Sequence, residues 1–212
     1  MKSLEKLDYL PYFTIQSVNQ LTGGSMASTR LLLSRQEESG KVFRIKRGYY
    51  MTREFWLQNK HDLNFTAMIS AIIQPHSYLT GVWVLQKYGV MTEGIYLVTA
   101  ATLKHTRSIS NKLASFHYFH IQEKLFNYYQ ETNFAGIICR EATAAKALFD
   151  FFYFRSEHPG LRSKNYDLAE DERLNLEEWD SKMKTEFLQL TEKSKSPKMK
   201  RIAANLSRKI WV

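Results

Sequence analysis

Apolar residues recur at helical spacing in residues 14–21 and again in residues 26–39. Thr14 can cap the amino end of the first segment, and Ser25 can cap the second. Two consecutive glycines separate the segments, and Gly40 can end the second in a left-handed conformation. The pattern therefore predicts two short helices joined by a tight turn.

Two short β-type runs, residues 41–45 and 49–51, follow the second predicted helix. They flank Lys46, Arg47 and Gly48, so they can pair as a hairpin with a basic tip. Two helices followed by such a hairpin predict a winged helix-turn-helix. The second helix would be the recognition helix, and the hairpin would be the wing.

This arrangement is suited to double-stranded DNA, because a helix fits the major groove and Lys or Arg side chains meet phosphates. The early residues of the second helix would reach base edges, and the basic residues around it would form a rim. We predict that the DNA-binding residues are Ser28, Thr29, Arg30, Arg35, Lys41, Arg44, Lys46 and Arg47. A helix-turn-helix used for protein contact, or plain solvated charge, is the alternative.

The pattern beyond the hairpin changes at about residues 53–63, where either a linker or a docking helix is consistent with the sequence. The prediction is an α+β chain of two domains, residues 1–60 as a winged helix-turn-helix and residues 61–212 as a mixed α/β domain ending in a helical hairpin. Helices are expected at 64–73, 77–88 and 142–154, and in two apolar stripes at 176–190 and 199–210. Ser196 can cap the last of these helices, with Pro197 at its first position. Strands are expected at 94–103, 114–121 and 134–141.

The charge of the chain agrees with an anionic partner. The formal net charge is +9, and residues 1–60 carry ten Lys and Arg against five Asp and Glu. The single cysteine, Cys139, lies in an apolar run, which predicts a buried, unreactive thiol and a reducing compartment. No signal-like or membrane-spanning run is visible, so we expect a cytoplasmic protein without membrane contact.

Histidines are the residues that most suggest an enzyme. In a strand, His117 and His120 would point to opposite faces, so they could not share a metal ion with His105. No Cys pair or glycine-rich phosphate loop accompanies them. We therefore predict no catalytic residues, no metal and no cofactor, although a carboxylate pair such as Glu93 with Glu141 stays open.

The order of these parts resembles one protein family over roughly residues 5–160. The chain has a winged helix ending in RGYY, then SYLTGVWVLQKYGVMTEGIYLVTAATLKHTRS, a pair of short strands and the helix EATAAKALFDFFYF. This order is similar to that of the AbiEi family of bacterial antitoxins, which are also transcriptional regulators of phage-defence operons. Each motif by itself is weak.

The resemblance implies that the amino-terminal domain represses its own operon at inverted repeats, a symmetry that suits a dimer on DNA. It further implies that the carboxy-terminal domain counteracts a neighbouring nucleotidyltransferase-type toxin without a stable complex, as in a type IV toxin–antitoxin system. Lys146 matches the family pattern, but a solvated lysine beside the core is an equal interpretation. The alternative function is a stand-alone regulator whose second domain senses an effector.

Overall fold

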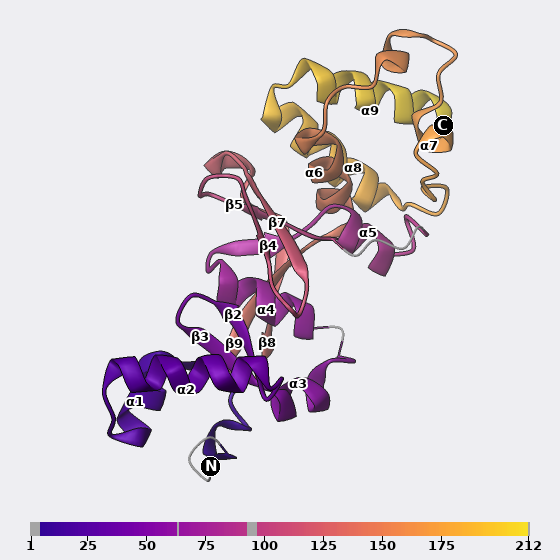
Figure 1. The fold of residues 1–212 in the computed structure, drawn as a ribbon. Coiled ribbons are helices and arrows are strands. Elements are labelled where there is room, and N and C mark those ends of the chain that lie inside the picture. The colour runs from indigo at the N-terminus through magenta and orange to yellow at the C-terminus, as the bar shows by residue number, and fades with distance from the viewer. Residues whose placement is uncertain (1–4, 63, 93–96, 212) are drawn as a thin grey trace. The chain divides into compact units, whose positions relative to one another are not determined.

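The computed structural model describes residues 5–62, 64–92 and 97–211 (Figure 1). The chain forms two compact units. The first consists of Met1–Pro75 together with Ile109–Ser115 and Thr132–Cys139, and the second contains the remaining residues. The first unit thus continues past the boundary expected at residues 53–63, and it includes two segments that come much later in the sequence.

The first unit begins with the two helices that the sequence predicts. They follow a 3-10 helix, Glu5–Leu7, and a short strand, β1 (Phe13–Thr14); the helices are α1 (Ile15–Thr22) and α2 (Met26–Glu38). Thr14 and Ser25 accept hydrogen bonds from backbone N–H groups in the first turn of each helix, as expected for N-caps. Gly40 adopts a φ of 70°, the left-handed conformation predicted for the helix end.

A three-stranded sheet completes this part of the unit. Strands β2 (Val42–Lys46) and β3 (Tyr49–Thr52) form the predicted hairpin, and β1 pairs with the outer side of β3, giving the order β1-β3-β2. The register shifts between Arg44 and Lys46, which is the irregularity of a β-bulge. The helices and the sheet enclose an apolar cluster made of Leu7, Phe13, Val18, Leu33, Val42 and Tyr50.

Two further helices belong to the first unit. The segment that the sequence left as a linker or docking helix is α3 (Arg53–Asn59), capped by Thr52. The predicted apolar helix is α4 (Phe65–Ile73), which packs beside β2. Because α4 was assigned to a second domain on its composition, its place in the first unit is a correction to the expected domain division.

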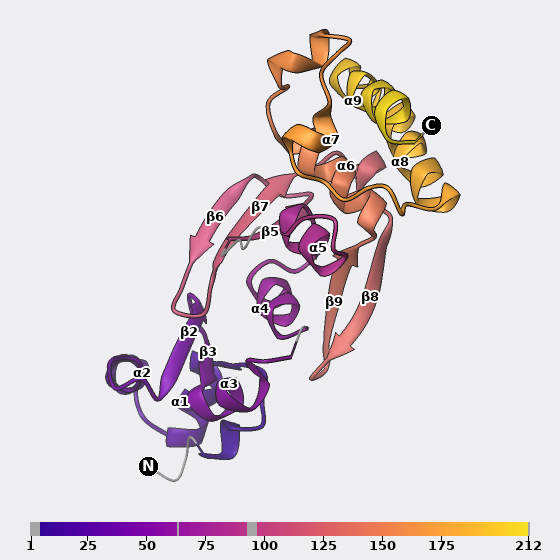
Figure 2. The ribbon, with the colours of Figure 1, turned by 90° about the vertical axis from the view of Figure 1, so that its right-hand side faces the viewer.

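Six strands are hydrogen-bonded in the order β6-β7-β5-β4-β9-β8 (Figure 2). The expected helix at 77–88 is wrong in its first part, where residues 77–79 pair with both β5 and β9; only the later part is helical, as α5 (Val82–Lys87). Strands β6 and β8 also form, although no strand was predicted for residues 104–113 or 127–133. The bounds are β4 Ser77–Leu79, β5 Leu97–Thr102, β6 Arg107–Ser110, β7 Ser115–His120, β8 Tyr129–Phe134 and β9 Ile137–Ala142.

The second unit contains the predicted buried helix and the closing helical pair. Helix α6 (Ala144–Phe154) is buried along most of its length and packs against α5, α8 and α9. The predicted stripe at 176–190 is only partly helical, because Asp180 caps α8 (Ser181–Ser194). Leu176 and Trp179 precede this helix and are nevertheless buried. Ser196 caps α9 (Pro197–Lys209) as expected. The short elements are the 3-10 helices Glu123–Leu125 and Pro159–Arg162, and α7 (Leu168–Asp171).

The expected α+β class, with a small sheet and a helical carboxy-terminal region, is confirmed. Among the described residues, no helix is both long and apolar enough to cross a membrane.

Candidate nucleic-acid interface

The turn between α1 and α2 is held by a side-chain network. The Asn19 side-chain amide donates to the carbonyl oxygen of Gly24 at 2.7 Å and to the Thr29 hydroxyl at 3.0 Å. The Thr29 hydroxyl in turn donates to the carbonyl oxygen of Ser25 at 3.1 Å. Thr29 is only 2% exposed, so its prediction as a base-contacting residue is wrong. Its side chain fixes the angle between the helices.

The outward face of α2 carries three of the predicted residues. Ser28, Arg30 and Arg35 are exposed. The Ser28 hydroxyl lies 2.9 Å from that of Ser25, within the first turn of the helix. Leu31 is 53% exposed between the two arginines, so this face offers an apolar surface as well as charge. A groove-binding helix needs this combination, because thymine methyl groups are read by apolar contact.

The hairpin presents further exposed cations next to α2. Lys41, Arg44 and Arg47 are exposed and form no ion pair with any residue that the structure describes. Unpaired exposed cations are free to replace the counterions of a phosphate backbone.

Lys46 has a structural role instead of the phosphate contact predicted for it. Its ammonium group donates to the carbonyl oxygens of Ile72 at 2.6 Å and Ile73 at 3.3 Å, and it lies 4.3 Å from the centre of the Tyr49 ring. These carbonyls lie in the last turn of α4, where helix carbonyls lack partners and the helix dipole attracts a cation. Lys46 therefore fastens the hairpin to α4.

The loop between β6 and β7 reaches the hairpin from a distant part of the sequence. The Asn111 amide donates to the carbonyl oxygen of Ile45 at 2.9 Å, and the exposed Lys112 donates to that of Glu37 at 3.2 Å. An open hollow of about 480 Å³ lies between these elements. It is lined by Glu37, Arg44, Ile45, Lys46, Arg47, Ile109, Ser110, Asn111 and Lys112.

Sequence reasoning missed Asn19, Asn111 and Lys112. Asn19 lies on a helix whose polar face looked solvated, and nothing local shows that its amide spans the turn. A signal existed for the other two: the alternating Ser-Ile-Ser before Asn-Lys is typical of a strand that enters a tight turn. No sequence signal shows that this turn meets β2.

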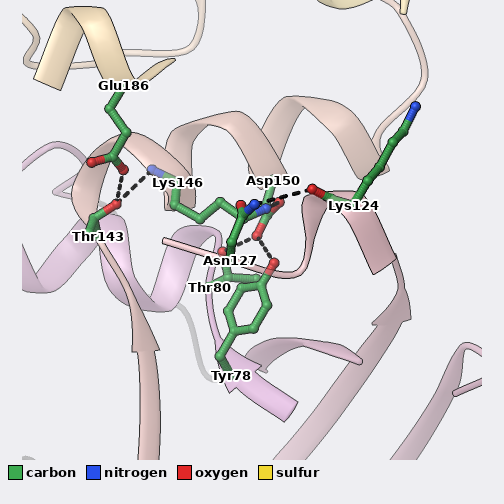
Figure 3. Close-up of polar contacts among 8 residues, drawn as sticks. All are labelled: Tyr78, Thr80, Lys124, Asn127, Thr143, Lys146, Asp150 and Glu186. Carbon is green, nitrogen blue, oxygen red and sulfur yellow. Dashed lines mark hydrogen bonds and ion pairs between the residues drawn. The ribbon is translucent and has the colours of Figure 1, made fainter. Parts of the chain in front are cut away.

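A separate polar cluster is buried in the second unit (Figure 3). The Lys146 ammonium forms an ion pair with Asp150, one helical turn later, and both side chains are 0% exposed. The second carboxylate oxygen of Asp150 accepts from the Tyr78 hydroxyl at 2.9 Å and from the Thr80 hydroxyl at 2.8 Å. The interpretation of Lys146 as a solvated lysine is therefore wrong.

Burial dominates the electrostatics of this cluster. Desolvation lowers the pKa of Lys146 and raises that of Asp150, and each charge opposes the shift of the other. Burial, and then the Asp150 charge, raises the pKa of Tyr78 well above its ordinary value. The Thr143 hydroxyl donates to Glu186 while capping α6 (Figure 3). Burial raises the pKa of Glu186. Both side chains of the ion pair are buried, so the cluster connects α6 to Tyr78 and Thr80 inside the core.

Two of the histidines and one of the carboxylates named from the sequence have separate neighbours. His117 lies 3.3 Å from the Ser108 hydroxyl and His120 lies 3.2 Å from the carbonyl oxygen of Lys104, so the two rings do not converge. Within the described ranges, no group of three or more metal-ligating side chains occurs. Glu141 forms an ion pair with Lys87, and Glu93 lies outside the described residues.

Cys139 is 1% exposed, and burial raises the pKa of its thiol to about 11, as expected for an unreactive cysteine. Part of the basic face of α9 is occupied. Lys198 donates to the carbonyl oxygens of Tyr153 and Arg155, and Arg201 pairs with Glu157. The exposed surface formed by α2 and the β2–β3 hairpin, called the helix-and-hairpin surface below, is therefore the stronger candidate for an anionic partner.

A comparison of the chain with protein-family models found no match, and neither did a search of curated proteins.

Proposed function

We propose that the chain is a DNA-binding transcriptional repressor whose first unit is a winged helix-turn-helix, and that it also acts as the antitoxin of a neighbouring nucleotidyltransferase-type toxin. The observation that carries the DNA-binding part is the surface formed by α2 and the β2–β3 hairpin. This surface exposes Arg30, Arg35, Lys41, Arg44 and Arg47, and none of these side chains has a carboxylate partner among the described residues.

The order of elements supports this proposal. A capped helix, a turn held by Asn19, a second capped helix and a bulged hairpin follow one another, and β1 pairs beside the hairpin. In helix-turn-helix proteins the second helix reads base edges, and flanking cations fix the register on the backbone. Arg30 is suited to a guanine edge, whereas Arg44 and Arg47 are suited to phosphates.

The antitoxin part rests on the resemblance to the AbiEi family. It concerns the second unit and is separate from the DNA-binding proposal for the first. It predicts that neutralisation needs residues outside the helix-and-hairpin surface. The protein and toxin are proposed to act without a stable complex.

The test of DNA binding is fluorescence anisotropy with the promoter of the chain's own operon and with a random duplex. The four exposed cations other than Arg30 predict a log–log salt slope of about −4, at about 0.9 per phosphate contact. Arg30→Ala should lose about 1–3 kcal/mol of discrimination between the promoter and the random duplex. Arg47→Ala should weaken binding to both alike. A slope near zero would exclude the proposal.

The antitoxin part is tested by co-expressing the chain with the adjacent open reading frame and scoring growth. The double variant Arg44→Asp/Arg47→Asp should lose repression and still rescue growth; Lys46 is left intact because it supports α4. If the adjacent open reading frame does not inhibit growth, or if the wild-type chain does not rescue growth, the result would favour a stand-alone regulator. If the double variant is folded but no longer rescues growth, DNA binding and toxin neutralisation are a single activity.

A further inference from the structure

We infer that the loop between β6 and β7 is part of the DNA-binding surface, with Lys112 gripping a backbone phosphate in the same hollow as Arg44 and Arg47. This inference rests on the proposed function and extends it to a segment far outside the helix-turn-helix. The loop belongs to the first compact unit although it lies more than half-way along the chain.

The loop is anchored for such a role. Both polar atoms of the Asn111 side chain form hydrogen bonds. Nδ2 donates to the carbonyl oxygen of Ile45, and Oδ1 accepts from the backbone N–H groups of Leu113 and Ala114. The first bond ties the loop to β2, and the other two shape the turn. Lys112 is thus held beside the hairpin by the hydrogen bonds of the neighbouring Asn111.

Lys112 keeps binding capacity after folding. Its ammonium group has three donors, and one is used by the carbonyl oxygen of Glu37 at 3.2 Å, so the others face solvent. Without a ligand, Lys112 meets a weak backbone acceptor instead of a carboxylate. A phosphodiester oxygen would be a stronger, charged acceptor for it.

The hollow has the size and charge for a phosphodiester group. Its volume of about 480 Å³ far exceeds the roughly 30 Å³ that one water molecule occupies. Arg44, Lys46, Arg47 and Lys112 line it against a single acid, Glu37. The local balance is therefore strongly positive, and three of these four cations are exposed.

The test uses the full chain and a duplex of random sequence, because a phosphate contact does not depend on the operator. Lys112→Gln should lower the magnitude of the salt slope by about 0.9, which corresponds to a loss of about fivefold in affinity at 0.15 M salt. Lys112→Arg, which retains the charge, should restore the slope. Arg44→Gln should lower the slope like Lys112→Gln, because the wild-type Arg44 and Lys112 side chains are both proposed to contact the DNA phosphate backbone.

The matched control is Lys124→Gln, which removes an exposed lysine from the second unit and should leave binding unchanged (Figure 3). Circular dichroism and thermal melting establish that each variant is folded. If the wild-type chain binds DNA with the expected slope but Lys112→Gln has the same salt slope as Lys124→Gln, the inference is wrong and the proposed function stands. If the wild-type chain shows no salt-dependent binding, both are wrong.

Discussion

Replacing Lys146 by Met tests how the buried ion pair contributes to stability. The substitution keeps the length of the side chain but leaves the Asp150 carboxylate, which is 0% exposed, without its counter-charge. Removing one member of a buried pair typically costs about 3–5 kcal/mol. We expect Lys146→Met to fall in this range at pH 7.

The magnitude can be derived independently, because a lone buried carboxyl can take up a proton. Protonating a carboxyl with an ordinary pKa of about 3.9 costs about 4 kcal/mol at pH 7 and about 1.5 kcal/mol at pH 5. In the variant the folded-state pKa of Asp150 would lie above its unfolded value. The folded state then binds more protons, so the destabilisation should shrink as the pH falls from 7 to 5.

A second variant separates charge from hydrogen bonding. In Lys146→Met/Asp150→Asn the amide oxygen can still accept from Tyr78 and Thr80, and only the amide N–H group lacks a partner. We expect a cost of about 1–3 kcal/mol with no dependence on pH in this range. The double variant should therefore be more stable than Lys146→Met alone.

The assay is urea unfolding followed by circular dichroism, with hydrogen exchange of the α6 amides as a local measure of the same free energy. The control is Lys200→Met, which breaks an exposed pair with Glu192 and should cost between about 0 and 1 kcal/mol. A cost below about 1 kcal/mol for Lys146→Met, unchanged between pH 5 and 7, would refute the reasoning.

Three further predictions concern other parts of the chain. Asn19→Ala removes both side-chain hydrogen bonds across the α1–α2 turn and should destabilise the first unit by about 1–3 kcal/mol, measured by melting. Under the proposed function it should also weaken DNA binding, measured by anisotropy. Asp180→Ala removes the N-cap of α8 and should cost about 1 kcal/mol in urea unfolding. The thiol of Cys139, whose pKa burial raises to about 11, should react with a thiol reagent at pH 8 far more slowly in the folded chain than in urea; equal rates would contradict its burial.

The features that sequence predicted correctly are local ones. Thr14, Ser25 and Ser196 were recognised as caps because a cap depends on a few adjacent residues. The β2–β3 hairpin was recognised for the same reason, since a basic turn with glycine separates two short β-type runs.

The features that sequence missed depend on partners far along the chain. Residues 77–79 are a strand because they pair with β5 and β9, and pairing over such distances overrides a local preference. Thr29 was assigned to the base edges because it lies in the first turns of the second helix, but its hydroxyl accepts a hydrogen bond from Asn19 and is buried. Lys146 is different: its i, i+4 spacing to Asp150 inside an apolar run was visible in the sequence, but the interpretation as a solvated lysine did not use it.

The composition of the first unit has a consequence for how the protein is made. Asn111 and Ile45 are 66 residues apart, and closing a loop of that length has an entropic cost of roughly 4 kcal/mol beyond a constant. During synthesis the helices and the hairpin leave the ribosome long before the β6–β7 loop does. The nascent chain would therefore hold an unfinished form of the proposed DNA-binding surface until more than half of the protein had been translated. Fragments translated from messages broken before that point would lack the β6–β7 loop and Lys112.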